Sequence, residues 1–130
     1  MRIIHRLPSS TEYNMFRQRC GWRTYDHQIA TDASANSLFC VLTEDASGSP
    51  IGMGRLVSDG HICVHVQDVL VIPEFQRMGL GRAIVDEILR WLDENVADTT
   101  NVGLLPAKVA QNFPGLSVSK TGRTRILDRV

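Results

Sequence analysis

The 130-residue sequence contains no apolar run that approaches the roughly 20 residues a membrane-spanning helix needs. Residues 1–6 also lack the apolar centre of a secretory signal peptide. We therefore expect a cytoplasmic protein with no membrane partner. Hydrophobic residues make up 43% of the chain and charged residues 22%, a balance typical of folded domains. A chain of this length is expected to form one domain, residues 1–130.

The chain also has no formal net charge at pH 7, because 14 Lys and Arg residues balance 14 Asp and Glu residues. A neutral chain offers no overall electrostatic attraction to nucleic acid, so we expect no nucleic-acid partner. Cysteines are few: Cys20, Cys40 and Cys63 are odd in number and have no CxxC spacing. This pattern argues against a disulfide framework and against a zinc site. We expect buried free thiols and no bound metal.

Hydrophobic periodicity and turn residues divide the chain into short elements. Apolar runs separated by turn-forming residues predict three consecutive antiparallel strands, at residues 38–42, 51–57 and 62–72. Residues 81–95 carry apolar side chains on one helical face and charged side chains on the other, which predicts an amphipathic helix. The remaining predicted elements are a strand (2–7), two helices (11–20 and 25–33), a strand (102–105), a brief helix (107–113) and a closing hairpin (116–119 with 123–127).

The segment that joins the long strand to the amphipathic helix carries the chemical signal. Gly79 and Gly81 let the backbone approach a bulky anion, and amide groups at a helix start lack partners within the helix. The positive end of the helix and the charges of Arg77 and Arg82 favour an anion at the same place. The sequence therefore predicts a local anion site, suited to a pyrophosphate, in a neutral protein.

Two common phosphate motifs do not fit these glycines. A Rossmann GxGxxG motif would need a third glycine where Ile84 stands, and a Walker loop would need Gly-Lys-Ser/Thr. The run Gln76-Arg77-Met78-Gly79-Leu80-Gly81 instead resembles the Q/R-x-x-G-x-G/A signature of the GNAT superfamily of N-acetyltransferases. The resemblance extends back through residues 52–56, 59–60 and 21–22, and it weakens after about residue 92.

This resemblance implies an α/β (α+β), GNAT-like fold. Its central sheet is mixed and mostly antiparallel, is splayed at the cofactor site, and is flanked by helices. It also implies acetyl-CoA as co-substrate. The strand backbone at Leu70 and Val71 would pair with the pantetheine arm, and the loop amides would hold the pyrophosphate. The loop residues are Gln76, Arg77, Met78, Gly79, Leu80, Gly81 and Arg82.

Catalytic residues are harder to predict. An alkylammonium with a pKa of about 10.4 is mostly charged at pH 7, so acyl transfer to an amine calls for a base. His65 is the first candidate because histidine exchanges protons near neutral pH, and Asp68 is the second. A structural hydrogen bond explains either residue equally well. Strand alternation predicts His65 and Gln67 on one face and Asp68 on the other.

The strand around these residues is similar to that of amino-sugar N-acetyltransferases in the superfamily, where a Glu-Asp pair occupies the place of Gln67-Asp68. Many family members also carry a tyrosine on the last helix that protonates the departing thiolate, but Phe113-Pro114 occupies that place here. No general acid can be carried over. The resemblance suggests that aromatic residues of the early helices wall an acceptor pocket; these are Tyr13, Trp22 and Tyr25, whereas Phe16 is expected in the core.

We therefore predict an N-acetyltransferase that transfers an acetyl group from acetyl-CoA to the primary amine of a small molecule. One alternative is a catalytically weak or inactive acyl-CoA sensor, which the missing tyrosine motivates. Another is a protein N-acetyltransferase. The final hairpin could also pair with a second copy of the chain, which leaves a homodimer open.

Overall fold

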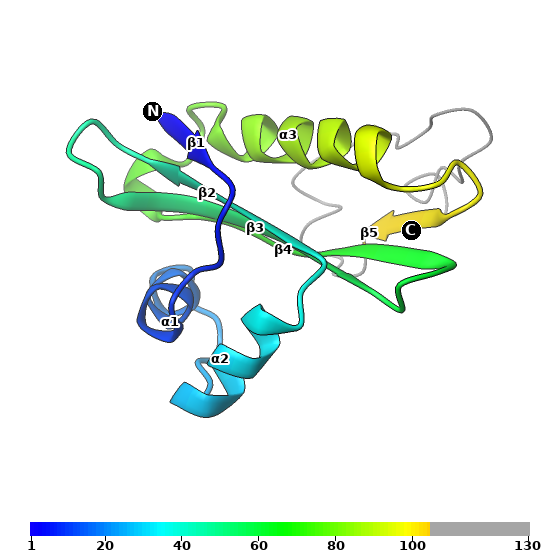
Figure 1. Cartoon of the computed structure of the whole chain (residues 1–130). Helices are drawn as coiled ribbons and strands as arrows, with labels where there is room; N and C mark the ends of the chain where they lie inside the picture. The colour runs from blue at the N-terminus through cyan, green and yellow to red at the C-terminus, as the bar shows by residue number, and fades with distance from the viewer. Residues whose placement is uncertain (105–130) are drawn as a thin grey trace.

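The structure is a computed structural model and describes residues 1–104. Figure 1 shows two layers of helices on opposite faces of one twisted sheet. The predicted helix at 107–113 and the closing hairpin lie outside the described residues. The described elements are β1 (Arg2–Ile4), α1 (Ser10–Arg19), α2 (His27–Ala35), β2 (Phe39–Glu44), β3 (Pro50–Ser58), β4 (Cys63–Val71), a short 3-10 helix (Pro73–Phe75), α3 (Leu80–Asn95) and β5 (Asn101–Leu104).

The five strands form a single mixed sheet in the order β1-β2-β3-β4-β5. The pairs β1–β2, β2–β3 and β3–β4 are antiparallel, and β5 is parallel to β4. A parallel neighbour requires a crossover, which here contains α3. In Figure 1, α3 covers one face of the sheet, and α1 and α2 lie on the other face. The predicted mixed, mostly antiparallel sheet with flanking helices is confirmed.

Local sequence explains where the helices begin and what they bury. Ser9 caps α1 in a capping box with Glu12, so two backbone N–H groups at the helix start find acceptors. Asp26 caps α2 in a similar way by accepting from the backbone N–H of Gln28. Helix α3 is held by tertiary packing, because its apolar face is buried against the sheet. That face consists of Leu80, Ile84, Val85, Ile88 and Leu92.

Helix α3 lies unusually close to β3 because two glycines face it. A Cβ at Gly54 would stand 2.6 Å from Cγ2 of Ile84 and 2.7 Å from Cδ1 of Ile88. A Cβ at Gly52 would stand 3.0 Å from Cδ1 of Ile84. Both isoleucines are fully buried, so the helix could not keep this position above larger β3 residues.

A bulge in β4 decides which side chains face which helix layer. Arg55 of β3 pairs with Asp68, but the next residue, Leu56, pairs with Val66, so Gln67 is an extra residue in β4. Before the bulge, Val66 packs in the core cluster beneath α3. After it, Leu70 packs in the second cluster, which includes residues of α1. The side-chain alternation therefore changes phase at Gln67.

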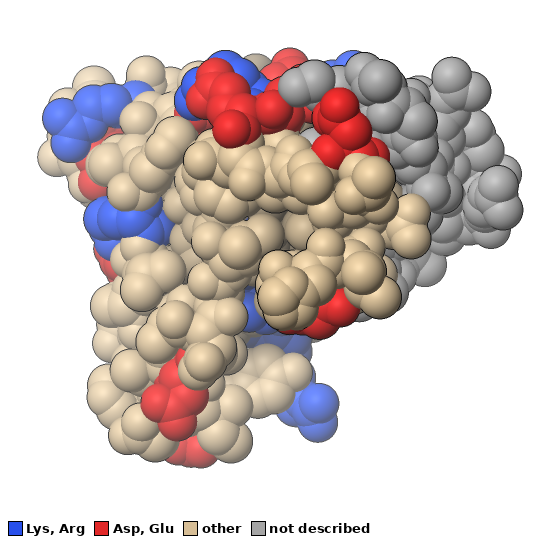
Figure 2. Space-filling model, turned by 45° about the vertical axis from the view of Figure 1, so that its right-hand side comes forward, with Lys and Arg blue, Asp and Glu red and all other residues tan. Residues whose placement is uncertain are grey.

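The surface carries charge of both signs. In Figure 2, Arg side chains are interspersed with Asp and Glu on the described part of the visible face. All three cysteines are free thiols, with Cys40 buried and Cys20 and Cys63 half-buried. Within residues 1–104, no helix is both long enough and apolar enough to cross a bilayer.

Candidate functional site

The turn between β4 and α3 has the backbone geometry of an anion-binding loop. Arg77 and Gly79 both adopt left-handed conformations, with φ of 64° and 84°. Where left-handed residues alternate with right-handed ones, successive backbone N–H groups point to the same side of the chain. Gly79 is also the N-cap of α3 and provides no side-chain cap. Within the described residues, the N–H groups of Leu80, Gly81 and Arg82 have no acceptor.

The charges around this turn strengthen the same site. The dipole of the 16-residue α3 places its positive end at the turn. Arg77 is exposed there, and Arg82 lies 3.6 Å from Asp86, measured from Nε to Oδ1, in a pair more than half exposed to solvent. A pair this exposed is weak and leaves Arg82 able to turn toward a ligand. The arrangement can bind a multiply charged anion.

The end of β4 lies directly before this turn and contacts it. β5 pairs with β4 from Cys63 to Val66. In residues 1–104, no strand pairs with that edge of β4 between Gln67 and Val71. The carbonyl of Val71 accepts hydrogen bonds from Nε2 of Gln76 at 2.8 Å and from Sγ of Cys20 at 3.4 Å. The structure thus brings Val71 and the loop residue Gln76 together, and it places Leu70 beside them with its side chain in the core.

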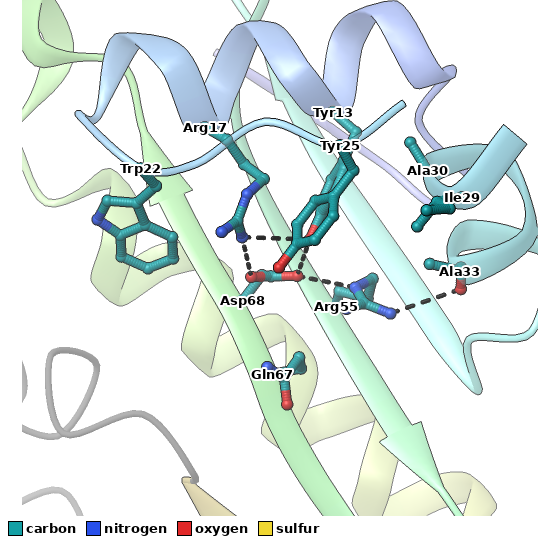
Figure 3. A pocket seen from close by; sticks show the side chains of 10 residues that line it. All are labelled: Tyr13, Arg17, Trp22, Tyr25, Ile29, Ala30, Ala33, Arg55, Gln67 and Asp68. Atoms are coloured by element: carbon teal, nitrogen blue, oxygen red, sulfur yellow. Dashed lines mark hydrogen bonds and ion pairs between the residues drawn. The ribbon is translucent and has the colours of Figure 1, made fainter. Parts of the chain in front are cut away.

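A pocket of about 460 Å³ opens between α1, α2 and the bulge of β4 (Figure 3). Tyr13, Trp22 and Tyr25 line it, as the resemblance suggested, whereas Phe16 is fully buried in the core. Gln67 and Asp68 both line the pocket, so the prediction that they face opposite sides is wrong. The bulge turns these two consecutive side chains to the same cavity. The other lining residues are Arg17, Ile29, Ala30, Ala33 and Arg55.

Asp68 is the centre of a buried polar network in this pocket. Its side chain is 1% exposed. Its Oδ2 accepts hydrogen bonds from the Tyr13 hydroxyl at 2.9 Å and from Nε of Arg55 at 2.8 Å. Nη1 of Arg17 lies 3.5 Å from Oδ1. Burial, together with the charge of Asp68, raises the pKa of the Tyr13 hydroxyl, so this phenol stays protonated and keeps donating.

Arg17 occupies the aromatic part of the pocket. Its guanidinium carbon lies 4.9 Å from the ring centre of Tyr25, 5.2 Å from that of Trp22 and 5.6 Å from that of Tyr13. The aromatic residues therefore stack on a cation of the protein itself. Sequence reasoning missed Arg17 and Arg55. A signal existed for Arg17, because it follows Tyr13 by four residues on the same helix.

The structure separates the two candidate bases. Asp68 lies in the pocket, whereas His65 does not line it. His65 is half-buried, and its Nδ1 has no hydrogen-bond partner among residues 1–104. Across the sheet, His65 is paired in register with Val57 on β3 and Gly103 on β5. Residues 1–104 contain no group of three His, Cys, Asp or Glu side chains placed to hold a metal ion.

Comparison with sequences of known proteins gives one family. The family model described as "Acetyltransferase (GNAT) family" matches residues 2–113. "GCN5-related N-acetyltransferase 3, chloroplastic" of Arabidopsis thaliana is 28% identical over 90 residues, which are 69% of this chain and 37% of that protein. "GCN5-related N-acetyltransferase 2, chloroplastic" of the same plant is 43% identical over 63 residues, which are 48% of this chain and 24% of that protein. The chain thus spans well under half the length of these relatives.

Solved structures with the same fold also exist. A probable acetyltransferase of unknown function from meticillin-resistant Staphylococcus aureus superposes with a TM-score of 0.77 at 23% identity, covering 85% of this chain and 83% of that one. A GNAT family acetyltransferase from Streptococcus pneumoniae superposes with a TM-score of 0.67 at 26% identity, covering 85% and 79%.

Proposed function

Because the chain belongs to the acetyltransferase (GNAT) family, we propose that it transfers an acetyl group from acetyl-CoA to the primary amine of a small molecule. The family generally uses acetyl-CoA. The observation that carries the proposal is the β4–α3 turn, where the backbone N–H groups of Leu80, Gly81 and Arg82 have no acceptor within residues 1–104. Two arginines and the helix dipole favour a diphosphate at this turn.

The pantetheine arm would lie along the edge of β4 at Leu70 and Val71. The Val71 carbonyl now accepts from the side-chain amide of Gln76. An amide N–H of pantetheine can replace that donor, so cofactor binding would exchange one hydrogen bond for an equivalent one. Gln76 would then be free to turn toward the phosphates, which fits its place in the loop.

In the proposed reaction, the amine nitrogen attacks the thioester carbonyl carbon. A C–N bond forms, the C–S bond breaks, and CoA leaves as a thiolate that takes up a proton. Asp68 is favoured over His65 as the general base because Asp68 lines the pocket and His65 does not. Its Oδ2 already accepts from Tyr13 and Arg55, so Oδ1, which lies 3.5 Å from Nη1 of Arg17, is the oxygen that would take a proton from the amine.

The test is a steady-state acetylation assay with a panel of small amines. Arg77→Gln and Arg82→Gln should each raise the KM for acetyl-CoA about tenfold and change kcat little, because each loses one charge from the diphosphate site. Arg90→Gln is the matched control, since Arg90 lies on the exposed face of α3 and pairs with Glu87 and Glu94. Failure of every amine to react would contradict the proposed activity.

A second candidate function is a non-catalytic acyl-CoA sensor. It is favoured by the state of Asp68, whose carboxylate is engaged by Tyr13 and Arg55 and is the one acidic side chain among the pocket's described lining residues. A sensor would bind acetyl-CoA without turning over any amine, and Asp68→Asn would leave the affinity for acetyl-CoA unchanged. A cytoplasmic location stays a prediction, because the word "chloroplastic" belongs to the names of the Arabidopsis relatives.

A further inference from the structure

We propose that the acceptor is a primary amine that also carries a carboxylate, as an amino acid does, and that Arg17 binds this carboxylate. This inference rests on the proposed function, because it assigns an acceptor to the pocket beside the cofactor site. It follows from the charges in the pocket, from the unused donors of Arg17 and from the size and apolar wall of the cavity.

The pocket has more positive than negative charge. Arg17 and Arg55 line it, and Asp68 is the one acidic side chain among its described lining residues. Arg23 adds a further exposed positive charge beside the pocket, with its guanidinium carbon 5.4 Å from the ring centre of Tyr25. An acceptor whose only charge was its ammonium group would be repelled by this excess. An acceptor with its own negative group would balance it.

The aromatic side chains do not form a cage for an ammonium ion. Such cages bind a cation over the faces of several rings. Here Arg17 already occupies that position, stacked near Tyr13, Trp22 and Tyr25. The aromatic rings instead hold a guanidinium in place, and an immobilised guanidinium is a preorganised site for a carboxylate.

Arg17 has hydrogen-bond donors left for a ligand. Its Nε donates to the backbone carbonyl of Arg23, and its Nη1 lies 3.4 Å from the Tyr13 hydroxyl and 3.5 Å from Asp68. Its Nη2 has no partner in the part of the chain that the structure describes. The side chain is only 12% exposed, so a ligand carboxylate paired with it would be largely removed from water.

Arg55 is a poorer candidate for the same task. Its Nε is bound to Asp68, and its Nη1 lies 3.2 Å from the Ser37 hydroxyl and 3.5 Å from the Ala33 carbonyl. These contacts fix Arg55 as the internal partner that neutralises Asp68. The excess positive charge that faces the cavity is therefore assigned to Arg17.

The rest of the cavity suits a molecule of amino-acid size. Its volume of about 460 Å³ lies within the usual range for small-ligand pockets. Ile29, Ala30 and Ala33 give it an apolar wall. In Figure 3, Asp68 lies between Arg17 and Gln67, so a carboxylate on Arg17 leaves the amine of the same molecule near Asp68 and the β4 bulge.

The kinetic test uses matched acceptors at saturating acetyl-CoA. Phenylalanine, its primary amide and phenethylamine form one set, and alanine, its amide and ethylamine form another. The acid of each set should have a kcat/KM at least about tenfold above its amide, because a charge-assisted hydrogen bond is lost in the amide. Arg17→Gln should bring this ratio close to one and leave the KM for acetyl-CoA unchanged. Arg90→Gln, which removes the same charge from the opposite side of the sheet, should keep the preference.

Direct binding separates this inference from the proposed function. Calorimetric titration with 3-phenylpropionate, which has the carboxylate but no amine, should show binding to the wild type and none to Arg17→Gln. Binding of 3-phenylpropionate would support a carboxylate site at Arg17 even if no amine is acetylated. Failure of every amine to react would overturn the proposed function but not this carboxylate site. Arg17→Lys, which keeps the charge but loses the planar fork, should bind with intermediate affinity and serves if Arg17→Gln does not fold. No binding of the carboxylate, or equal use of the acid, the amide and the simple amine of each set, would overturn the inference.

Discussion

Asp68 shows how one buried residue can serve both structure and function. It is held by a phenol and two guanidinium groups that come from α1 and β3. A buried ion pair contributes little net stability when intact, but the loss of one partner leaves an uncompensated charge in a place that water does not reach. Asp68 is therefore difficult to replace, whichever role it has in proton transfer.

The first prediction concerns this network. Asp68→Asn should lower the free energy of unfolding by about 3 kcal/mol or more, because Arg17 and Arg55 would then share the pocket without a carboxylate. Tyr13→Phe removes one neutral donor to the same oxygen and should cost only about 1 kcal/mol. Urea denaturation of both variants measures the difference. Equal losses of stability would mean that the charge of Asp68 matters less than its hydrogen bond to Tyr13.

At the scale of elements, the closeness of α3 to the sheet is the main feature. It depends on Gly52 and Gly54, which present no side chain to Ile84 and Ile88. The first residues of the same helix carry the N–H groups of the proposed anion-binding turn, which have no acceptor within residues 1–104. Packing beneath α3 therefore sets where the proposed diphosphate site lies relative to the edge of β4.

The second prediction tests this packing. Gly54→Ala should destabilise the protein by about 1–3 kcal/mol, because its Cβ would overlap two buried isoleucines. Combining it with Ile84→Ala should cost less than the sum of the two single changes, since the space left by the isoleucine admits the new methyl group. Thermal or urea unfolding of the three variants gives the coupling. Strict additivity would show that α3 does not rest on Gly54 in solution.

For the molecule as a whole, the proposed cofactor site connects two parts of the fold. One part is the end of β4, and the other is the start of α3. A ligand that binds both should stabilise the folded state, because it has no comparable site in the unfolded chain.

The third prediction follows from this linkage. Acetyl-CoA at about one hundred times its Kd should add about 2.7 kcal/mol to the free energy of unfolding and raise Tm by several degrees. Pantetheine, which lacks the diphosphate, should give a much smaller shift at the same concentration. Differential scanning calorimetry measures both. A Tm that does not respond to acetyl-CoA would contradict the site at the turn.

The sequence by itself determined the elements whose signals are local. The helical spacing of Ile84, Ile88 and Leu92 identified α3, and turn residues marked the antiparallel strands. Gly79 with its neighbours marked the turn that we propose binds an anion. The pattern also indicated the family. These features depend on residues close together in the chain, so periodicity and backbone preference are enough to reveal them.

Only the tertiary structure decided the composition of the pocket. Arg17, Arg55 and Asp68 come from α1, β3 and β4, and nothing in the local sequence of any one of them reveals the other two. The bulge at Gln67 arises from the register between β3 and β4, and it turns Asp68 into the cavity where strict alternation predicted it would face away from Gln67. Register and long-range ion pairing depend on how separate elements pack, which a one-dimensional pattern does not contain.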